Sequence, residues 1–298
     1  MRGVPPLAAH DRDTLATVLA DLRPALHRYC ARMTGSVIDG EDAVQEALAK
    51  AIASFAHAGS VDNPEGWLFR IAHNSSLDLL RRRAREQRSD EELATLEDPR
   101  TAADHALATR AALGTFMHLP VAQRQVVILM DVLGYSLDEI AALTDRTVAS
   151  IKAALHRGRT TLRELVDAER PPRLGVAADA RLLAYIDRFN ARDFDAVRDM
   201  LAEDVHLDLV ARRQMNGKPE VQTYFSNYAT KTDWHLVPGF VEGQPAVIVV
   251  DPASPTRVAY FVLLEWNERG RLAAVRDFRY ARYAVDDADH AFAATRLP

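Results

Sequence analysis

The stretch "GYSLDEIAALTDRTVASIKAALHRGRTTLREL", residues 134–165, decides the fold of the first half of this chain. Ser136 stands three residues before Glu139, which is the spacing of a capping box, so a helix is expected to begin there. Apolar residues recur at helical spacing before and after a short turn at 144–146. The sequence therefore predicts two helices joined by a tight turn, which is a helix-turn-helix.

The outward face of the second helix, from residue 147 onward, is polar and cationic. Such a helix fits the DNA major groove, where side chains reach base edges, while arginines further along lie near phosphates. The side chains expected to contact DNA from this motif are Arg146, Thr147, Ser150, Lys152, His156, Arg157 and Arg159. A repressor or an activator uses the same pattern, so the motif alone predicts DNA binding and no more.

A second basic helix is expected upstream, where "WLFRIAHNSSLDLLRRR" occupies residues 67–83. Asn63 can cap this helix, and Pro64 fits its first turn. The apolar stripe of this helix is expected to consist of Leu68, Ile71, Ala72, Ser75 and Leu79. Another face is polar and basic, and an ordinary solvated helix face would have the same composition.

The composition is typical of a soluble protein, with 48% hydrophobic residues, 27% charged residues and a net charge of −5. Cys30 is the only cysteine, which excludes an internal disulfide and a cysteine metal cage. The histidines lack the spacing that a zinc site needs. No apolar run is long enough to span a membrane, and the N-terminus lacks the apolar core of a signal peptide. We therefore expect a cytoplasmic protein with no metal, no cofactor and no membrane partner.

Changes in composition divide the chain into four parts. Residues 10–88 and 107–170 have helical periodicity, and the acidic stretch 89–106 between them has the composition of a linker. Two prolines and a glycine mark a further boundary near residue 172. Residues 177–298 begin with two short helices and continue in valine-rich and aromatic runs, which predicts an α+β domain with one curved sheet. The expected fold class is a multidomain chain that is all-α at first and α+β at its end.

Two segments of the helical part resemble a known family. "LPVAQRQVVILMDVLGYSLDEIA", residues 119–141, resembles domain 4 of bacterial sigma factors, which reads the −35 promoter element. "GEDAVQEALAKAIASF", residues 40–55, followed by the basic helix, is similar to domain 2 of the extracytoplasmic-function (ECF) sigma factors. The resemblance implies domain 2 at 10–88, domain 4 at 107–170, and two partners: promoter DNA and the RNA polymerase core, through its β′ clamp helices and β flap. Ala154 departs from many relatives, which carry a basic residue there.

The same resemblance assigns roles to residues of domain 2. The residues that it places against core polymerase are Glu41, Asp42, Gln45 and Glu46. Those that it places near the −10 element are Arg70, His73, Asn74, Arg81, Arg82 and Arg83. A cationic track beside aromatic side chains is the usual means of holding single-stranded DNA, so these roles are physically consistent.

The last part of the chain resembles SnoaL-like domains of the NTF2-like fold, a cone-shaped α+β barrel with a pocket. The resemblance rests on "LLAYIDRFNARDFDAVRDMLAEDVHLDL" at 182–209 and "MNGKPEVQTYF" at 215–225. Some relatives are cyclases or isomerases with an aspartate and a histidine as acid and base. The candidate pocket residues here are His206, Asp208, Trp234, His235, Tyr260 and Asp277. His206 and Asp208 share one face of an alternating strand, which is either the pocket or solvent.

The sequence thus predicts an ECF-type sigma factor that directs core polymerase to promoters. It is not expected to have catalytic residues of its own, and its SnoaL-like domain is expected to modulate it in cis through a small-molecule or protein ligand. Two alternatives stay open. One is a helix-turn-helix repressor or activator that does not bind core polymerase. The other is a SnoaL-like enzyme domain on a sigma-derived scaffold.

Overall fold

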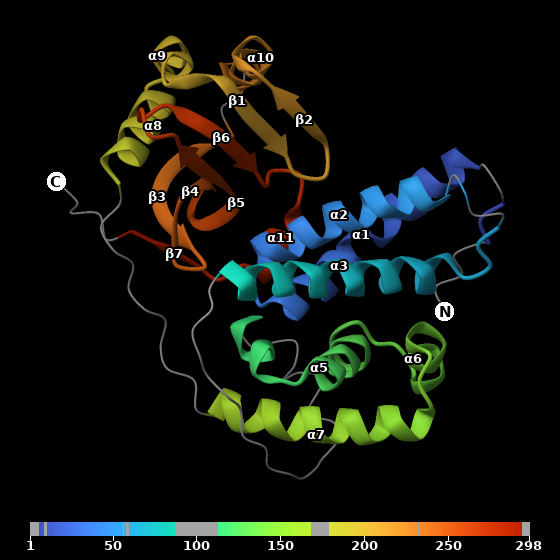
Figure 1. Cartoon of the computed structure of the whole chain (residues 1–298). Helices are drawn as coiled ribbons and strands as arrows, with labels where there is room; N and C mark the ends of the chain where they lie inside the picture. The colour runs from blue at the N-terminus through green and yellow to red at the C-terminus, as the bar shows by residue number, and fades with distance from the viewer. Residues whose placement is uncertain are drawn as a thin grey trace. The chain divides into compact units, whose positions relative to one another are not determined.

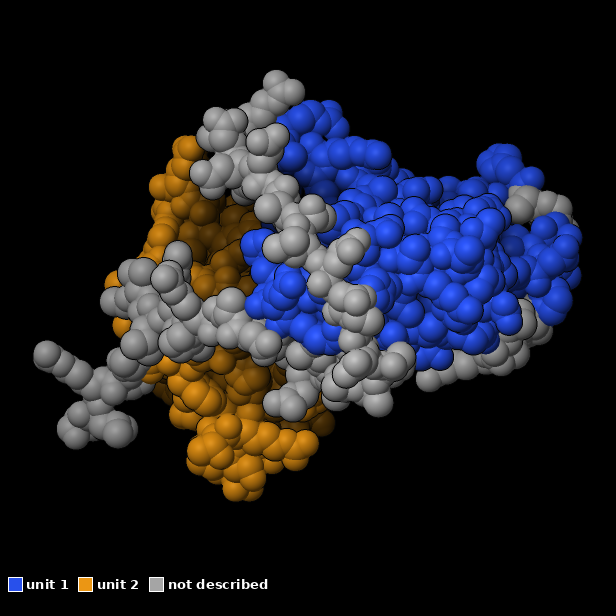
Figure 2. Space-filling view, turned by 90° about the horizontal axis from the view of Figure 1, so that it is seen from below, with its two compact units in different colours: residues 1–170 blue, residues 171–298 orange. Residues whose placement is uncertain are grey.

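The protein consists of two compact units, Met1–Arg170 and Pro171–Pro298 (Figure 2). The computed structural model describes residues 6–8, 11–55, 57, 60–86, 113–167, 179–229, 231 and 233–293. The linker expected at 89–106 lies outside these residues. Within the described ranges no helix combines the length and the apolar character that crossing a membrane requires.

Three long helices begin the first unit and run side by side (Figure 1). They are α1 (Arg12–Thr34), α2 (Val37–Phe55) and α3 (Pro64–Glu86). The side chain of Asn63 accepts a hydrogen bond from the Gly66 N–H at 3.0 Å, which confirms the cap predicted for α3. Leu68, Ala72 and Leu79 are buried on α3 as predicted, whereas Ile71 is half-buried.

The helix-turn-helix lies in the second half of this unit. Its elements are η1 (Leu113–His118), α5 (Val121–Val127), η2 (Ile128–Val132), α6 (Leu137–Thr144) and α7 (Val148–Asp167). The predicted capping box is present, because Ser136 Oγ accepts from the Glu139 N–H at 3.3 Å and the Glu139 carboxylate accepts from the Ser136 N–H at 2.8 Å. Asp145 ends α6 in the left-handed conformation, with φ 54°. The η2 segment is a π-helix, which is wider than an α-helix.

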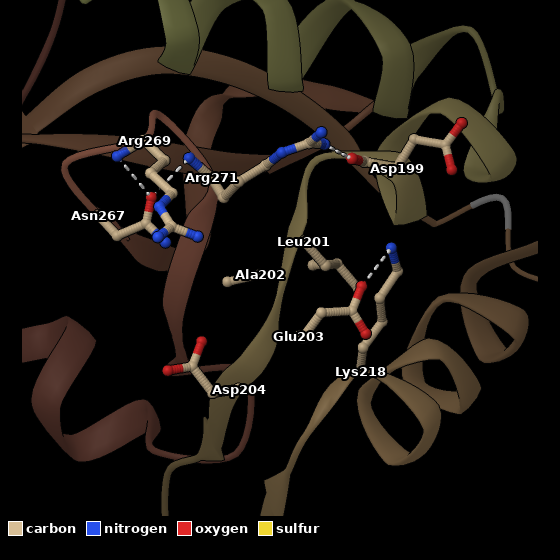
Figure 3. Close-up of a pocket in the computed structure, with 9 residues that line it drawn as sticks. All are labelled: Asp199, Leu201, Ala202, Glu203, Asp204, Lys218, Asn267, Arg269 and Arg271. Atoms are coloured by element: carbon tan, nitrogen blue, oxygen red, sulfur yellow. Dashed lines mark hydrogen bonds and ion pairs between the residues drawn. The ribbon is translucent and has the colours of Figure 1, made fainter.

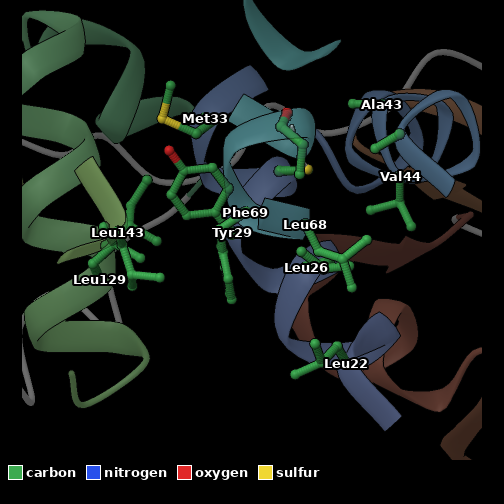
Figure 4. Close-up of a cluster of buried hydrophobic side chains, with 14 of the residues drawn as sticks. Leu22, Leu26, Tyr29, Met33, Ala43, Val44, Leu68, Phe69, Leu129 and Leu143 are labelled. Atoms are coloured by element: carbon green, nitrogen blue, oxygen red, sulfur yellow. Dashed lines mark hydrogen bonds between the residues drawn. The ribbon is translucent and has the colours of Figure 1, made fainter. Parts of the chain in front are cut away.

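One hydrophobic core joins these two groups of helices. Figure 4 shows Tyr29 and Phe69 between Leu129 and Leu143 on one side and the leucines of α1 and α3 on the other. The Tyr29 and Phe69 rings meet edge to face, with centroids 5.5 Å apart. The two helical segments that the sequence predicts thus share one core.

The second unit contains helices and one curved sheet (Figure 1). The helices are α8 (Ala180–Asn190), α9 (Phe194–Asp199), α10 (Lys218–Ala229) and α11 (Arg282–Asp287). The strands are β1 (Leu201–Leu209), β2 (Arg213–Asn216), β3 (His235–Val241), β4 (Gln244–Asp251), β5 (Ser254–Trp266), β6 (Leu272–Asp277) and β7 (His290–Phe292). These elements confirm the predicted α+β class.

The strand order in the sheet is β2-β1-β6-β5-β4-β3-β7. β1 and β6 are parallel, and the other neighbouring strands are antiparallel. Asp179 and Asp193 cap α8 and α9 with their side chains, so both short helices begin at signals that the sequence contains. The turn between β5 and β6 is closed by the Asn267 side chain, which accepts from the Arg269 and Arg271 N–H groups at 3.1 and 2.9 Å.

Candidate functional site

The first half of α7 presents a polar face to solvent. Thr147, Ser150, Lys152 and Arg157 are exposed. Thr147 Oγ1 accepts a hydrogen bond from the Ser150 N–H at 3.2 Å, so the threonine also caps the helix. Within the described part of the chain, neither Lys152 nor Arg157 has a carboxylate partner, which leaves both cations available to phosphates.

Arg159 lies in a different environment from the one expected for a DNA contact. Its guanidinium donates two hydrogen bonds to the Asp131 carboxylate, at 2.9 and 2.6 Å. The two side chains are only 12% and 0% exposed. This bidentate pair ties α7 to η2, so the structure gives Arg159 an internal partner in place of a phosphate. His156 and Arg146 are half-buried.

Ala154, where many relatives carry a basic residue, is buried on the inner side of α7. One turn later, a Cβ added to Gly158 would lie 2.7 Å from the Val127 Cγ2 atom of α5. Only small residues allow α7 to approach α5 this closely. The departure at Ala154 therefore belongs to the packing of α7 and has no access to DNA in this fold.

The outward face of α3 carries the residues expected near the −10 element. Asn74 and Arg82 are exposed, and no ion pair involves Arg82 among the residues that the structure describes. Arg81 donates to Asp78 at 3.2 Å, and Arg83 pairs with the buried Asp39. The exposed pair of Arg81 with Asp78 contributes little stability, so a phosphate can replace that carboxylate, whereas Arg83 is held by a buried charge.

Arg70 and His73 lie where α3 meets the helix-turn-helix. Arg70 is 4.0 Å from the Asp145 carboxylate. His73 Nδ1 is 2.8 Å from the Tyr29 hydroxyl. Burial, and then the positive charge of Arg146, lowers the pKa of His73 below its usual 6.5. His73 is therefore engaged inside the protein, whereas Arg70 stays exposed beside an exposed carboxylate.

The face of α2 expected to bind polymerase is only partly accessible. Asp42, Gln45 and Glu46 are half-buried and lie on one side of the helix with the exposed Ala49. Glu41 is fully buried and forms an ion pair with Arg23. Glu41 accepts a hydrogen bond from Gln45 at 3.5 Å but, unlike the other three predicted contacts, has no exposed surface.

Comparison with known proteins identifies the family of the helical part. The model of sigma-70 region 2 matches residues 18–86, and that of sigma-70 region 4 matches residues 110–162. The ECF RNA polymerase sigma factor SigM of Mycobacterium tuberculosis is 31% identical over 167 residues, which cover 54% of this chain and 82% of SigM. The chain belongs to the ECF RNA polymerase sigma factors. Residues 11–86 are called domain 2 below, and residues 113–167 are called domain 4.

Other similar proteins cover different shares of this chain. The ECF sigma factor SigW of Bacillus subtilis is 28% identical over 167 residues, which cover 52% of this chain and 89% of SigW. Among solved structures, the ECF sigma factor SigJ of M. tuberculosis is 19% identical and covers 88% of this chain and 95% of its own, with a TM-score of 0.35. A SnoaL-like protein of Burkholderia thailandensis is 16% identical and covers 38% of this chain and 97% of its own, with a TM-score of 0.27.

The second unit of this ECF sigma factor has a buried polar cluster around Asp277, at the end of β6. One carboxylate oxygen accepts hydrogen bonds from the hydroxyls of Tyr224, at 2.7 Å, and Tyr228, at 3.0 Å. The other accepts from the Arg279 N–H at 2.7 Å. The Tyr228 hydroxyl is also 3.1 Å from that of Tyr260. We call these five residues the Asp277 cluster.

Burial sets the protonation states in the Asp277 cluster. It raises the pKa of Asp277, although the hydrogen bonds from Tyr224 and Tyr228 oppose this. Burial followed by the charge of Asp277 raises the pKa of Tyr260 to about 12 and that of Tyr228 further. The tyrosines are therefore neutral hydrogen-bond donors near pH 7. Beside them, the Nε1 atom of the buried Trp234 has no hydrogen-bond partner in the described structure.

The structure separates the predicted pocket residues into two groups, with His235 in neither. Tyr260 and Asp277 belong to the Asp277 cluster, and the Trp234 ring lies 5.7 Å from the Tyr228 ring. His206 and Asp208 occupy the opposite face of the sheet, because Asp208 is level with Arg276 and the next residue, Leu209, is level with Asp277. The partners of this group are Asn216 for His206, at 2.7 Å, and Arg276 for Asp208, at 3.5 Å. His235 is exposed.

The sequence analysis missed Tyr224 and Tyr228, although a signal was present. The two tyrosines stand four residues apart on α10, so they lie on one helix face. A pair of hydroxyls on an otherwise apolar face indicates a buried polar partner.

A hollow of about 660 Å³ lies elsewhere in the second unit, between β1, the β5–β6 turn and the start of α10. Figure 3 shows Lys218 beside Glu203 and Arg271 reaching toward the Asp199 carbonyl. Both acidic and basic side chains line this open hollow, and none of the predicted pocket residues does. No group of three or more His, Cys, Asp or Glu side chains within the described ranges is arranged to hold a metal ion.

Proposed function

We propose that this ECF sigma factor selects promoters through two basic helix faces, with α3 at the −10 element and α7 at the −35 element. The observation that carries the proposal is that Asn74, Arg82, Lys152 and Arg157 are exposed on these faces, and that the three cations have no carboxylate partner in the described structure. Cations without internal partners can release counterions from DNA, so affinity should fall steeply with salt.

The face of α2 formed by Asp42, Gln45 and Glu46 is our candidate for the contact with the β′ clamp helices of core polymerase. Two features support it: the three polar side chains lie together, and the inner side of α2 is anchored in the core by Val44, Ala47 and Ala51. A rigid helix that offers one polar face suits a specific protein partner. Domain 4 is proposed to contact the β flap. The protein would then act in the cytoplasm, where the polymerase is.

The second unit is proposed to modulate the sigma part in cis. The Asp277 cluster is the candidate binding site for a small-molecule or protein ligand, because it gathers neutral hydroxyl donors and a carboxylate next to the unpartnered Trp234 Nε1. Burying Trp234 Nε1 without a hydrogen-bond partner costs stability, and a ligand with an acceptor atom at this point would offset that cost. Catalysis by the same cluster is the alternative, since a carboxyl group with a raised pKa can exchange protons.

Run-off transcription with core polymerase tests the proposal. The full chain is compared with a truncation after Glu169, on promoters selected from genomic fragments. Glu46→Lys should abolish transcription, whereas Glu164→Lys, an exposed control on α7, should not. A more active truncation would make the second unit an inhibitor, and an inactive one would make it a required part.

If neither form binds core polymerase or starts a transcript, the sigma proposal fails. DNA binding without transcription would then favour a helix-turn-helix repressor or activator. Turnover of a small molecule that Asp277→Asn abolishes would favour the enzyme alternative.

A further inference from the structure

A groove of about 670 Å³ in the second unit runs between α8 and the turn that joins β5 to β6. Its lining combines four arginines with an apolar part made of Trp266, Met200 and three alanines. The arginines are Arg181 and Arg188 from α8 and Arg269 and Arg271 from the turn. We call this site the arginine groove. Its volume is typical of a site for one small molecule.

The positive charge of the arginine groove is largely unpaired. Among the described residues, Arg188, Arg269 and Arg271 have no carboxylate partner. Arg188 donates to the Met200 sulfur at 3.2 Å, and Arg271 donates to the main-chain carbonyl of Asp199. Asp199 is the one acidic residue of the described lining, and Figure 3 shows its carboxylate turned away from Arg271. A concave surface with one sign of charge concentrates ions of the opposite sign.

The fourth arginine, Arg181, is held as a flat surface at one side of the groove. Its guanidinium carbon lies over the Trp266 ring, 5.5 Å from the ring centroid. Its Nε and Nη2 atoms donate to the Asp179 carboxylate at 3.0 and 2.7 Å, which fixes the plane of the guanidinium. The Arg181 side chain is still 49% exposed. Guanidinium planes and aromatic rings are the surfaces on which nucleobases stack.

We infer that the arginine groove binds a nucleoside polyphosphate. The base stacks against the pair formed by Arg181 and Trp266, and the phosphates contact the three arginines without carboxylate partners. Phosphate alone does not need the stacking surface, and a base alone does not need the cations, so the combination indicates a ligand that carries both. A nucleic acid strand also carries both, but its sites extend over several nucleotides, whereas this volume suits one small ligand.

This site is distinct from the Asp277 cluster, because none of the five residues of that cluster lines the arginine groove. It is also independent of the proposed promoter binding, since all of its residues belong to the second unit. The inference therefore adds a second ligand site to the unit that is proposed to modulate the sigma part.

Isothermal titration calorimetry of the full chain tests the inference, with ATP in the absence of magnesium as the probe. ATP is sufficient because stacking tolerates any base. It should bind once per chain, with a dissociation constant in the micromolar range. Adenosine and inorganic triphosphate each carry only part of the recognised groups, so each should bind at least about tenfold more weakly.

Four variants of the full chain separate the groove from general charge effects. Arg188→Gln and Arg269→Gln each remove an exposed cation and should each weaken ATP binding about tenfold. Trp266→Leu should weaken binding of ATP and leave that of inorganic triphosphate unchanged. The matched control is Arg257→Gln, an exposed arginine near the other end of β5 with no carboxylate partner in the described structure, which should have no effect.

Arg157→Ala, on the proposed DNA face of α7, should also leave ATP binding unchanged. Because Trp266 is half-buried, its variant can fail to fold, and the two exposed arginine variants are then sufficient for the test.

Three results would overturn the inference. The first is no binding of ATP, and the second is equal weakening by Arg257→Gln and Arg269→Gln. The third is binding of inorganic triphosphate as tight as that of ATP, which would make the groove a non-specific anion surface. Tighter binding of an oligothymidylate than of ATP, lost in Arg269→Gln, would assign the groove to single-stranded nucleic acid instead. Transcription is measured separately, so the proposed function stands or fails without regard to these results.

Discussion

Replacing Arg159 by alanine should destabilise the first unit rather than weaken DNA binding selectively. Arg159 and Asp131 form a bidentate pair with side chains 12% and 0% exposed. Removing one partner of a buried pair leaves the other charge uncompensated, which costs about 3 kcal/mol. With a urea dependence of about 2 kcal/mol per molar, the unfolding midpoint should fall by roughly 1.5 M.

The matched variant is Arg157→Ala, which removes an exposed cation two residues earlier on α7. It should leave the midpoint unchanged and reduce the slope of log affinity against log salt by about 0.9. Urea unfolding followed by helical circular dichroism gives the midpoint, and fluorescence anisotropy of labelled promoter DNA gives the slope. If Arg159→Ala lowers the slope like Arg157→Ala and keeps the midpoint, then Arg159 contacts phosphate and the internal pair is not its main role.

Four further outcomes are expected. Because burial raises the pKa of Asp277, its charged form destabilises the fold above that pKa. Asp277→Asn should therefore have a higher melting temperature than the parent chain at pH 8. A parent chain with the same melting temperature at pH 8 and pH 5 would contradict this. His73 has a lowered pKa and faces Tyr29, Arg70, Asp145 and Arg146, so the first unit should lose stability as the pH falls below 6.5, seen as a lower melting temperature at pH 5.5 that His73→Gln removes. Ser136→Ala should cost about 1 kcal/mol of unfolding free energy through loss of the α6 cap, while Ser226→Ala in the other unit should leave the unfolding of the first unit unchanged. Asp42→Ala should weaken binding of core polymerase about tenfold with an unchanged melting temperature. Glu41→Gln should instead lower the melting temperature, because Glu41 is buried and paired with Arg23. The reverse pattern would make Glu41 the polymerase contact and Asp42 the structural residue.

Local signals predicted the helices well, because each signal acts over a few residues. The cap at Asn63 and the capping box at Ser136 are both present, and the outward face of α7 carries the polar side chains that its periodicity indicates. The common core of domains 2 and 4 was not predictable. It depends on contacts such as that of Arg124 with Met33, which are 91 residues apart in the chain.

Only part of the candidate site in the second unit could be predicted from the sequence, for a similar reason. Alternation in β1 places His206 and Asp208 on one face, but it does not say which face is buried with Asp277. That depends on the register of the parallel pairing between β1 and β6, two strands that are far apart in the sequence. Arg159 shows the same limit, since its partner Asp131 lies 28 residues away on a π-helical turn.

In this π-helical turn, η2, the number of residues matters more than which residues they are. A π-turn contains an extra residue relative to an α-helical turn, and each residue rotates a helical side chain by about 100°. Losing one residue between 128 and 132 would restore an α-helix and turn Asp131 away from Arg159. It would also shift Tyr135, which follows directly, relative to Glu65, to which its hydroxyl donates a hydrogen bond. A one-codon deletion here would thus break two long-range contacts at once, whereas many single substitutions would break neither.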